Sequence, residues 1–421
     1  MSYRDGRLVA SQRLFDHLVP AVQLNNEDEA VEVLRAAFDA AVRRQMMADV
    51  PVSMFLSGGL DSSAVALHAV QAGAMVKDAY TIAFHQDDQR HDAQSDDLHH
   101  ARIMAQRLGI ELKVITAGRD FLGLLPGLVR FMEDGFSDPA AINTYLISAG
   151  ARRDGIKVLL SGQGADEYLG GYRRYLAEKG LAALPRPLRT LLGSVQGLLP
   201  AALPGRFNAL NRRVRRLAQL AAQTPQARLK AMYTWSPDST VRGLMHDDPG
   251  SAADADFNAW VASHQHADML ETMMAVDRQY DLLSLNLSYT DRMSMAASVE
   301  ARVPFLDFDL VRTMNAIPMA MKVQGSQGKH VFKRAMTPAL PREIVYREKA
   351  GFGLPIRAWL RQGSTLVDHY LNQPRLQRQG LYNAAAVRQL LDAQFSGRAD
   401  HSHTILTLLC QQLWLEQAQL G

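Results

Sequence analysis

The chain contains a run of seven small and polar residues whose types suit phosphate binding, Ser57-Gly58-Gly59-Leu60-Asp61-Ser62-Ser63. An apolar segment that predicts a buried strand, residues 52–56, precedes it, and a segment that predicts a helix, residues 64–70, follows it. Two adjacent glycines let the backbone approach an anion closely, and the first N–H groups of a helix attract it. The hydroxyls of Ser57, Ser62 and Ser63 are further donors. The run therefore predicts a phosphate-binding turn.

Asp61 is the acidic residue of this run, and its charge repels a phosphate unless a cation lies between them. The sequence therefore predicts that Asp61 binds Mg²⁺, a cation that prefers oxygen ligands. The alternative is an ordinary strand-to-helix turn in which Asp61 and Ser62 cap the helix, because both residue types are favoured at caps.

A second run repeats this arrangement, Ser161-Gly162-Gln163-Gly164-Ala165-Asp166-Glu167, and Gly170-Gly171-Tyr172 follows it. It comes after residues 156–160, which predict another buried strand. If the two strands share a parallel sheet, both runs lie at its carboxyl edge, where Asp61 and Asp166 can bind one Mg²⁺. Taken alone, Asp166 and Glu167 are also typical of a solvated helix start, and the role of Glu167 stays open.

The segments around these runs alternate between strand and helix patterns. Strands are expected at residues 52–56, 79–84, 111–116 and 156–160, and helices at residues 27–49, 96–108, 121–132 and 140–153. Such alternation predicts an α/β fold in which helices cover both faces of a parallel sheet. Strand patterns end at about residue 181, and later helices are expected at residues 271–288, 306–316, 329–336 and 404–420. The predicted organisation is a short first segment (1–25), an α/β domain (26–180) and a mainly helical region (181–421).

The bulk composition excludes several classes of protein. Hydrophobic residues make up 47% and charged residues 21% of the chain, as in soluble globular proteins, and the net charge of +3 gives no general case for nucleic-acid binding. The lone cysteine, Cys410, excludes a disulfide framework and a cysteine-based metal cluster. No apolar run is long enough to span a membrane, and the first residues lack a signal segment, so we expect a cytoplasmic protein without a membrane partner.

The first run matches the SGGxDS motif of the PP-loop ATP pyrophosphatases and lacks the Gly-Lys-Ser/Thr ending of a Walker A loop. With the second run and two later blocks, it resembles the synthetase domain of the glutamine-dependent asparagine synthetases over roughly residues 25–365. The later blocks are residues 291–295 with 300–307, and residues 329–330 with 349–356. The resemblance implies the PP-loop fold and a ligase that uses ATP and Mg²⁺. In that reaction a carboxylate, aspartate in the commonest members, becomes an acyl-adenylate, and an amine then forms the amide and releases AMP.

The resemblance also implies roles for single residues. Lys329 matches a lysine near the α-phosphate, and a cation at a helix start has little structural reason to be there. Ser161 and Gly162 match contacts to pyrophosphate. Leu56, Ile82 and Phe84 match an apolar wall near adenine, although apolar residues at these positions also suit plain strand core. Asp291 and Arg292 match a motif that lines the cleft.

Two further segments of the later blocks receive different interpretations. Glu300 and Arg302 are expected to form a buried structural ion pair rather than part of the site. Lys349 and the Gly-Phe-Gly turn after it are expected to form a mobile loop over the nucleotide.

The start of the chain departs from the family. Full-length members begin with a catalytic cysteine after the initiator methionine, and Ser2 stands in that place here. We therefore expect the glutaminase domain to be missing, with residues 3–9 as a remnant of its edge. The amine would then be free ammonia, the product of a separate glutaminase subunit, or another amine. A homo-oligomer is compatible with the sequence.

Gln163 is the second departure, because ammonia-using members carry a glutamate there and β-lactam-forming members an aromatic hydroxyl. An amide can orient an amine but cannot take its proton at neutral pH. Three alternatives to asparagine formation stay open: an amide synthetase of a peptide or secondary-metabolite pathway, a tRNA-modifying enzyme, and a non-catalytic partner subunit. The single cysteine and the low net charge argue against the tRNA enzyme.

Two segments of the helical region have competing interpretations. Residues 181–204 are rich in leucine and proline and suit ordinary helical core, or else a docking face for a partner or a membrane. The cluster Arg212-Arg213-Val214-Arg215-Arg216 suits a solvated helix face rather than a nucleic-acid site.

Overall fold

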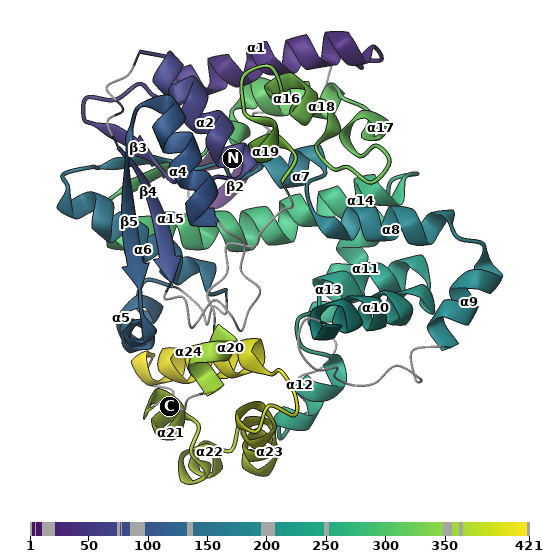
Figure 1. The fold of residues 1–421 in the computed structure, drawn as a ribbon. Coiled ribbons are helices and arrows are strands. Elements are labelled where there is room, and N and C mark those ends of the chain that lie inside the picture. Colours follow the sequence, from purple (N-terminus) through teal and green to yellow (C-terminus); the bar gives the residue numbers. More distant parts are fainter. Residues whose placement is uncertain are drawn as a thin grey trace.

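The structure is a computed structural model, and it describes residues 2–4, 6–10, 22–73, 76, 78–84, 97–132, 138–194, 207–247, 252–347, 356–361 and 365–418. A two-stranded antiparallel hairpin opens the chain, β1 (Ser2–Arg4) and β2 (Arg7–Ala10). A parallel sheet and many helices follow, as Figure 1 shows. The predicted α/β class is confirmed.

The described strands of the parallel sheet follow the order β7-β6-β3-β4-β5. They are β7 (Glu300–Arg302), β6 (Val158–Leu160), β3 (Val52–Met54), β4 (Asp78–Phe84) and β5 (Glu111–Ala117). A bridge between Phe55 and Tyr80 joins β3 to β4. Met54 lies opposite Leu160, so β3 and β6 end at the same level of the sheet. The two polar runs therefore emerge side by side.

Two hydrophobic clusters show that both faces of this sheet are covered. Met54 and Leu160 point into a cluster shared with α1 (Glu27–Gln45), α2 (Leu60–Gln71) and α4 (Asp97–Leu108). Leu159 and Tyr80 point into a second cluster, shared with α6 (Ala140–Arg153). Because neighbouring residues of a strand face opposite sides, this division places helices on both faces.

The region after residue 181 is mostly helical but is not free of strands. β7 pairs in parallel with β6, and its backbone bonds extend to Ser161, whose N–H donates to the carbonyl of Arg302 (2.8 Å). The sequence prediction that strand patterns end at residue 181 is therefore wrong at this point. β7 is Glu-Ala-Arg and lacks the apolar run that marks the equally short strands β3 and β6.

Other helices of the chain surround this core, and Figure 1 shows their arrangement. Those nearest the sheet edge are α7 (Ala165–Leu169), α15 (Ser288–Ala296), η4 (Pro304–Leu306), α16 (Phe308–Ala316), α17 (Met319–Lys322), α18 (His330–Met336) and α19 (Arg342–Val345). Those on the right and lower right of Figure 1 are α8 (Arg173–Ala183), α9 (Arg186–Ser194), α10 (Phe207–Ala221), α11 (Pro225–Tyr233), α12 (Asp238–Leu244), α13 (Ala252–Ser263) and α14 (Met269–Val276). The last are α20 (Ile356–Arg361), α21 (Thr365–Tyr370), α22 (Gln373–Gln379), α23 (Ala384–Phe395) and α24 (Ser402–Gln417).

Two predicted helices differ in kind from simple α-helices. Residues 121–132 divide into a 3₁₀ segment, η1 (Arg119–Leu124), and a short helix, α5 (Leu125–Val129). Pro126 lies in the first turn of α5, which explains the new start. The middle of the predicted helix 271–288 is a π-helix, η3 (Asp277–Leu287), between α14 and α15.

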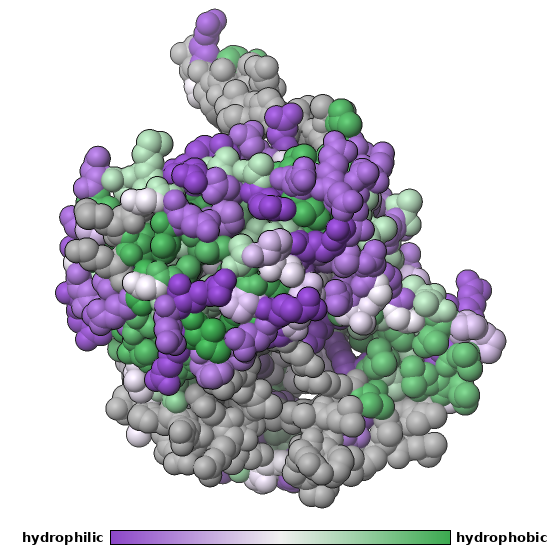
Figure 2. All heavy atoms as spheres, turned by 45° about the horizontal axis from the view of Figure 1, so that its top comes forward, coloured by the Kyte–Doolittle hydropathy of each residue, from purple (hydrophilic) through white to green (hydrophobic). Residues whose placement is uncertain are grey.

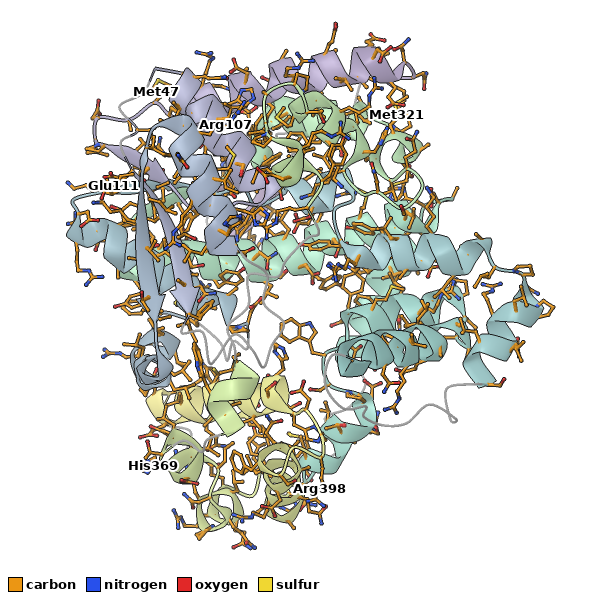
Figure 3. All side chains as sticks on the ribbon, in the orientation of Figure 1. Met47, Arg107, Glu111, Met321, His369 and Arg398 are labelled. Atoms are coloured by element: carbon orange, nitrogen blue, oxygen red, sulfur yellow. The ribbon has the colours of Figure 1, made fainter. Side chains whose placement is uncertain are left out.

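Contacts between distant segments hold the helical region against the α/β core. Arg107 of α4 donates to the carbonyl of Ala339, just after α18 (3.3 Å), and Figure 3 shows Arg107 beside these helices. Arg334 of α18 pairs with Glu27 (2.6 Å) and Asp28 (2.7 Å) at the start of α1. Among the described helices, none combines the length and the apolar content that a bilayer span requires.

Candidate active site

The first polar run forms a tight turn from β3 into α2. Gly59 is the N-cap of α2 and no side chain caps this helix, so the alternative in which Asp61 and Ser62 cap it is not what the structure has. Instead, the Ser62 hydroxyl lies 3.0 Å from the Ser57 hydroxyl and donates to the carbonyl of Gly59 (3.2 Å). The serines therefore shape the loop, and the first N–H groups of α2 keep the orientation that suits an anion.

Glycines allow the two runs to pack backbone against backbone. Gly58 has a φ of +67°, and a Cβ there would lie 2.3 Å from the backbone nitrogen of Ala101 in α4. A Cβ at Gly162 would lie 2.9 Å from the backbone nitrogen of Ser62. Neither position accepts a larger residue without moving the loop, because the close atoms belong to the backbone.

Lys329 brings the two predicted metal ligands together. Its ammonium nitrogen lies 2.5 Å from Asp61 Oδ2 and 2.7 Å from Asp166 Oδ1. Burial opposes its charge, but the two carboxylates more than offset that cost and hold the pKa of Lys329 above its ordinary value. The structure therefore brings Asp61, Asp166 and Lys329 together, with the lysine between the acids, and their chemical roles stay predictions.

The backbone around Lys329 is built for this placement. Lys329 precedes α18 rather than starting it, and its φ of +55° lies in the left-handed region that non-glycine residues rarely adopt. Its N–H donates to the carbonyl of Leu169 (3.1 Å). A Cβ at Gly171 would lie 1.9 Å from Asp166 Oδ1 and 2.2 Å from Lys329 Cε. Gly171 therefore makes the room in which the acid and the lysine meet.

Glu167 and Tyr172 form a polar layer behind Asp166. Glu167 is 2% exposed, which excludes a solvated helix start for this residue. The hydroxyl of Tyr172 donates to Glu167 Oε1 (2.5 Å). Burial, together with the charges of Glu167 and Asp166, raises the pKa of Tyr172 well above its ordinary value, so this hydroxyl stays protonated at neutral pH.

Gln163 is held from the opposite side of the site by α15. Its Nε2 donates to the hydroxyl of Thr290 (2.8 Å), while its Oε1 is buried and has no hydrogen-bond partner in the part of the chain that the structure describes. A buried acceptor without a partner is costly unless a ligand supplies a donor. Thr290 precedes the predicted pair Asp291 and Arg292, of which Asp291 is exposed and Arg292 half-buried. From α15, Thr290 and the phenol of Tyr289 both meet the Gln163 side chain.

The predicted nucleotide contacts divide into two groups. Ser161 and Gly162 lie at the end of β6 against the first run, where Ser161 Oγ accepts from the N–H of Gln163 (3.3 Å). The proposed adenine wall lies along the neighbouring strands: Leu56 (1% exposed) and Ile82 (8%) are buried, and Phe84 packs edge-on against Trp359 with ring centroids 6.0 Å apart. Its side chains thus also serve as strand core.

Arg347 is a contact that sequence reasoning missed. Its guanidinium donates to the carbonyl of Gly58 (2.9 Å), approaches that of Ser57 (3.4 Å) and pairs with Asp97 at the start of α4. It thus connects the segment after α19 to the loop between β3 and α2. Its separation from that loop by 289 positions leaves no spacing signal in the sequence.

The sequence also predicts the structure of two later segments, the Glu300–Arg302 pair and the Lys349 loop. Arg302 Nε does pair with Glu300 Oε1 (2.8 Å), but the Glu300 side chain is 56% exposed, so the prediction of a buried pair is wrong in that respect. Glu300 of β7 faces solvent, and Arg302 also donates to the carbonyls of Gln45 and Met47 at the end of α1. The predicted loop of Lys349 and the Gly-Phe-Gly turn lies outside the described residues.

The two carboxylates of the site suit a Mg²⁺ ion that also binds a phosphate. Mg²⁺ is commonly held by one or two carboxylates with phosphate oxygens and water completing its shell, and Asp61 and Asp166 supply two carboxylates at a loop whose glycines leave no room for a Cβ. Among the described residues, no group of three His, Cys, Asp or Glu side chains forms a self-sufficient metal site. A cation here would therefore need ligands from a bound phosphate.

Comparison with known proteins gives a consistent family. The family model described as asparagine synthase matches residues 33–416. A Mycobacterium tuberculosis protein named putative asparagine synthetase (glutamine-hydrolyzing) is 32% identical over 403 residues, which cover 93% of this chain and 58% of that protein. Asparagine synthetase (glutamine-hydrolyzing) 1 of Bacillus subtilis is 29% identical over 395 residues, 92% of this chain and 59% of its own. Amidase chry2 of Gibberella zeae is 23% identical over 420 residues, which cover 89% of this chain and 60% of that protein. The chain spans less than two thirds of the length of these curated relatives.

Proposed function

The chain belongs to the asparagine synthase family, and on this premise we propose that it forms an amide from a carboxylate and an amine at the expense of ATP. The most specific form of the proposal is the conversion of aspartate to asparagine with ammonia. The observation that carries it is the placement of Lys329 between Asp61 and Asp166, beside the first turn of α2. This arrangement combines a fixed cation, two carboxylates of a type that binds Mg²⁺ and a helix N-terminus at one edge of the sheet.

In the first step, an oxygen of the substrate carboxylate attacks the α-phosphorus of ATP. The bond from this phosphorus to the bridging oxygen of the β-phosphate breaks, and pyrophosphate leaves with the electron pair. Negative charge grows on the leaving group and on the oxygens around phosphorus. Lys329 stays protonated and meets that charge, and the N–H groups at the start of α2 face the departing phosphates.

Mg²⁺, when bound by Asp61 and Asp166, would neutralise part of the polyphosphate charge and so favour departure of pyrophosphate. The protein's own contribution is to keep the two acids close despite their repulsion. Lys329 offsets that repulsion in the structure, and the missing Cβ at Gly171 lets all three side chains fit.

In the second step, the amine nitrogen attacks the acyl carbon, the bond to the phosphate oxygen breaks and AMP leaves. The attacking nitrogen must also lose a proton. Gln163 cannot accept it, but its Oε1 can accept a hydrogen bond from the amine and so orient the lone pair toward the acyl carbon. We infer that Gln163 positions the amine and that the proton passes to another acceptor.

A second candidate changes the substrates and keeps the chemistry. Gln163 is neutral, and its amide is fixed by Thr290, so the site has no general base at the position where the amine is expected. An amine that arrives unprotonated, or a carboxylate other than aspartate, would suit such a site. This candidate is an amide synthetase of a peptide or secondary-metabolite pathway.

The deciding experiment is ATP–pyrophosphate exchange with the purified chain, Mg²⁺ and a panel of carboxylates. Exchange with aspartate alone supports asparagine formation, and exchange with another carboxylate selects the second candidate. Absence of exchange with every carboxylate, together with absence of ATP binding, would identify a non-catalytic partner subunit and refute the proposal.

The amine source needs a separate measurement. Product is followed with ammonium, with glutamine, and with glutamine plus a glutaminase added as a separate protein. We expect product from ammonium and from the third mixture. Product from glutamine with the chain alone would contradict the expectation that this chain does not hydrolyse glutamine.

A further inference from the structure

Positive charge is concentrated in one segment of the chain. Between Glu178 and Asp238 there is no acidic residue, and the same stretch holds ten lysines and arginines. Because the whole chain has a net charge of +3, the remainder has a net charge of −7. The overall charge, which predicts no membrane or nucleic-acid partner, is therefore the average of a strongly basic segment and an acidic remainder.

Part of this positive charge is used inside the protein. Arg228 is 1% exposed and forms a bidentate pair with Glu178 (2.6 and 2.8 Å). Lys230 binds Asp238 and Asp254. In contrast, the guanidinium groups of Arg186 and Arg189 of α9 have neither a hydrogen bond nor an ion pair with the described residues, and Arg186 is exposed. The outer part of the segment thus keeps cations that the fold itself does not need.

The same helices expose apolar side chains. Leu188 and Leu191 of α9 are 51% and 60% exposed, and Val214 and Leu217 of α10 are 39% and 37% exposed. Each pair is spaced by three residues and so lies on one side of its helix. Figure 2 shows an apolar patch at the right edge of the molecule, where Figure 1 places α9. Together these features describe a helix that is basic and apolar on its outer surface.

The inner side of α9 is already packed, so the exposed leucines have no place in the core. Leu192 and Leu184 pack on a small cluster of Leu181, Leu220 and Ala221. A Cβ at Gly193 would lie 2.6 Å from the Cβ of Ala222, which shows how closely the end of α9 meets the end of α10. Rotating α9 to bury Leu188 and Leu191 would break this contact.

We infer that α9 and α10 form a docking surface for a bilayer that contains anionic phospholipids. The exposed leucines would enter the interfacial region, and the arginines would bind the phosphate groups beside them. The bilayer is complementary to both features of this surface, because its apolar layer suits the leucines and its negatively charged phosphate groups suit the arginines. The contact is peripheral and requires no helix that spans the membrane.

Two other occupants are less compatible with these residues. A nucleic acid would bind the arginines, but its contacts to phosphates are polar and would leave Leu188 and Leu191 in water. A second copy of the chain would bring two arginine-rich surfaces together, and like charges across an interface oppose association. Neither explains the combination of exposed leucines with unpaired arginines on α9.

The test is sedimentation of the full chain with large vesicles. We expect binding to vesicles of phosphatidylcholine mixed with phosphatidylglycerol, and about tenfold or more weaker binding to pure phosphatidylcholine or at high salt. Arg186→Gln with Arg189→Gln should weaken binding about 25-fold, since each cation near an anionic surface contributes a factor of about five. Leu188→Gln with Leu191→Gln should weaken it about tenfold.

Matched controls separate this surface from general effects of charge and hydrophobicity. Leu8→Gln with Val9→Gln removes leucine and valine side chains that are 51% and 59% exposed on the β1–β2 hairpin. Arg35→Gln with Arg398→Gln removes two other exposed arginines, of which Figure 3 shows Arg398 at the far end of the molecule. Neither control should change vesicle binding, and circular dichroism should show that all variants are folded.

Three outcomes would overturn the inference. The first is equal binding to neutral and anionic vesicles, or binding to neither. The second is duplex DNA binding as tight as vesicle binding and insensitive to Leu188→Gln with Leu191→Gln, which would assign a polyanion site. The third is a dimer in analytical ultracentrifugation that these same substitutions dissociate, without any vesicle binding. ATP–pyrophosphate exchange is measured in parallel and should be unaffected, so this inference and the proposed function fail independently.

Discussion

At the scale of single residues, the site depends on how Lys329 balances two acids. Asp61 and Asp166 come from the ends of neighbouring strands and would repel each other at this distance. Lys329 supplies the compensating charge from a strained backbone position with a φ of +55°. Such strain persists where the surrounding structure fixes it and where function gains from it. The lysine therefore has a structural role at the position where we propose its chemical one.

We predict that Lys329→Met lowers the rate of ATP–pyrophosphate exchange about 10²- to 10³-fold, the usual effect of removing one group that stabilises transition-state charge. It also leaves the two carboxylates without their cation, which should lower the free energy of unfolding by about 3 kcal/mol without Mg²⁺. Added Mg²⁺ should restore more stability to this variant than to the parent chain, as thermal unfolding would show.

The control is Lys113→Met, which removes an exposed lysine paired with Glu111 on β5. It should leave both exchange and the response to Mg²⁺ unchanged. If Mg²⁺ stabilised Lys329→Met no more than the parent chain, the assignment of Asp61 and Asp166 as metal ligands would be wrong.

A second prediction concerns Gln163. Gln163→Glu should raise the rate of amide formation from ammonia at least several-fold at neutral pH, because a carboxylate can take the proton that an amide cannot. Thr290→Val should leave exchange intact and raise the KM for the amine, since it frees the side chain that Thr290 orients. An unchanged ammonia-dependent rate in Gln163→Glu would show that position 163 does not limit the reaction.

At the scale of elements, the site is made by close approach of loops, and glycine decides how close they come. The loop after β6 touches the loop after β3 at Gly162 and admits Lys329 at Gly171. The strands only bring the loops to one edge of the sheet. The loops then meet because no Cβ stands between them.

We predict that Gly171→Ala separates Asp166 from Lys329 and abolishes measurable exchange, because the new Cβ would lie 1.9 Å from Asp166 Oδ1. Gly180→Ala is the matched control, since no atom lies within 4 Å of a Cβ at this position in α8. It should raise the free energy of unfolding by about 0.5–1 kcal/mol, as alanine favours a helix. Full exchange activity in Gly171→Ala would refute this account of the loop.

The short helix α17 carries a buried lysine whose effect depends on pH. Burial and the nearby charge of Arg278 lower the pKa of Lys322 from 10.5 to about 7, although Glu271 opposes the shift. The unfolded chain binds a proton below pH 10.5 and the folded chain only below about 7, so stability is lost as pH falls between these values. Below about pH 7 the loss is complete and constant.

Lys322→Met removes this titration and keeps the apolar stem. We expect it to raise the free energy of unfolding by about 2–4 kcal/mol at pH 7 and to have a shrinking effect as pH rises toward 10. Urea unfolding across this range measures the difference. A constant difference at every pH would show that packing, and not the charge of Lys322, is responsible.

At the scale of the whole molecule, part of the helical region shares hydrophobic packing with the α/β core. β7 extends the sheet beside β6, and Val311, Phe332 and Ile344 from the helical region share a hydrophobic cluster with α1 and β3. Helices α8, α11 and α14 contribute to a separate cluster. The domain boundary expected near residue 180 stays a prediction.

We predict that a fragment of residues 22–194 does not fold alone, because it loses β7 and the helices that cover α1. Circular dichroism and limited proteolysis of this fragment should show little protected structure, while the core of the full chain should unfold cooperatively. A fragment that melted cooperatively and bound ATP would show that the first 194 residues are an independent domain.

Local patterns in the sequence were sufficient for the parts of the fold that depend on neighbouring residues. The alternation of apolar residues predicted β3 to β6 and their flanking helices, because a buried strand and an amphipathic helix each leave a periodic trace. The paired glycine runs predicted a phosphate loop and its metal-binding acids. The β7 strand, which has a charged residue at each end, and the π-helix η3 left no such trace.

The sequence by itself determined the chemistry available at the site: the family, the two acids, the lysine and the amide at position 163. Only the tertiary structure decided how these groups are used. It set Lys329 between Asp61 and Asp166, turned Gln163 by a bond to Thr290, and brought Arg347 to the phosphate loop. The physical reason is range, because periodicity and turn chemistry act over a few residues, whereas these contacts join positions 127 to 289 apart.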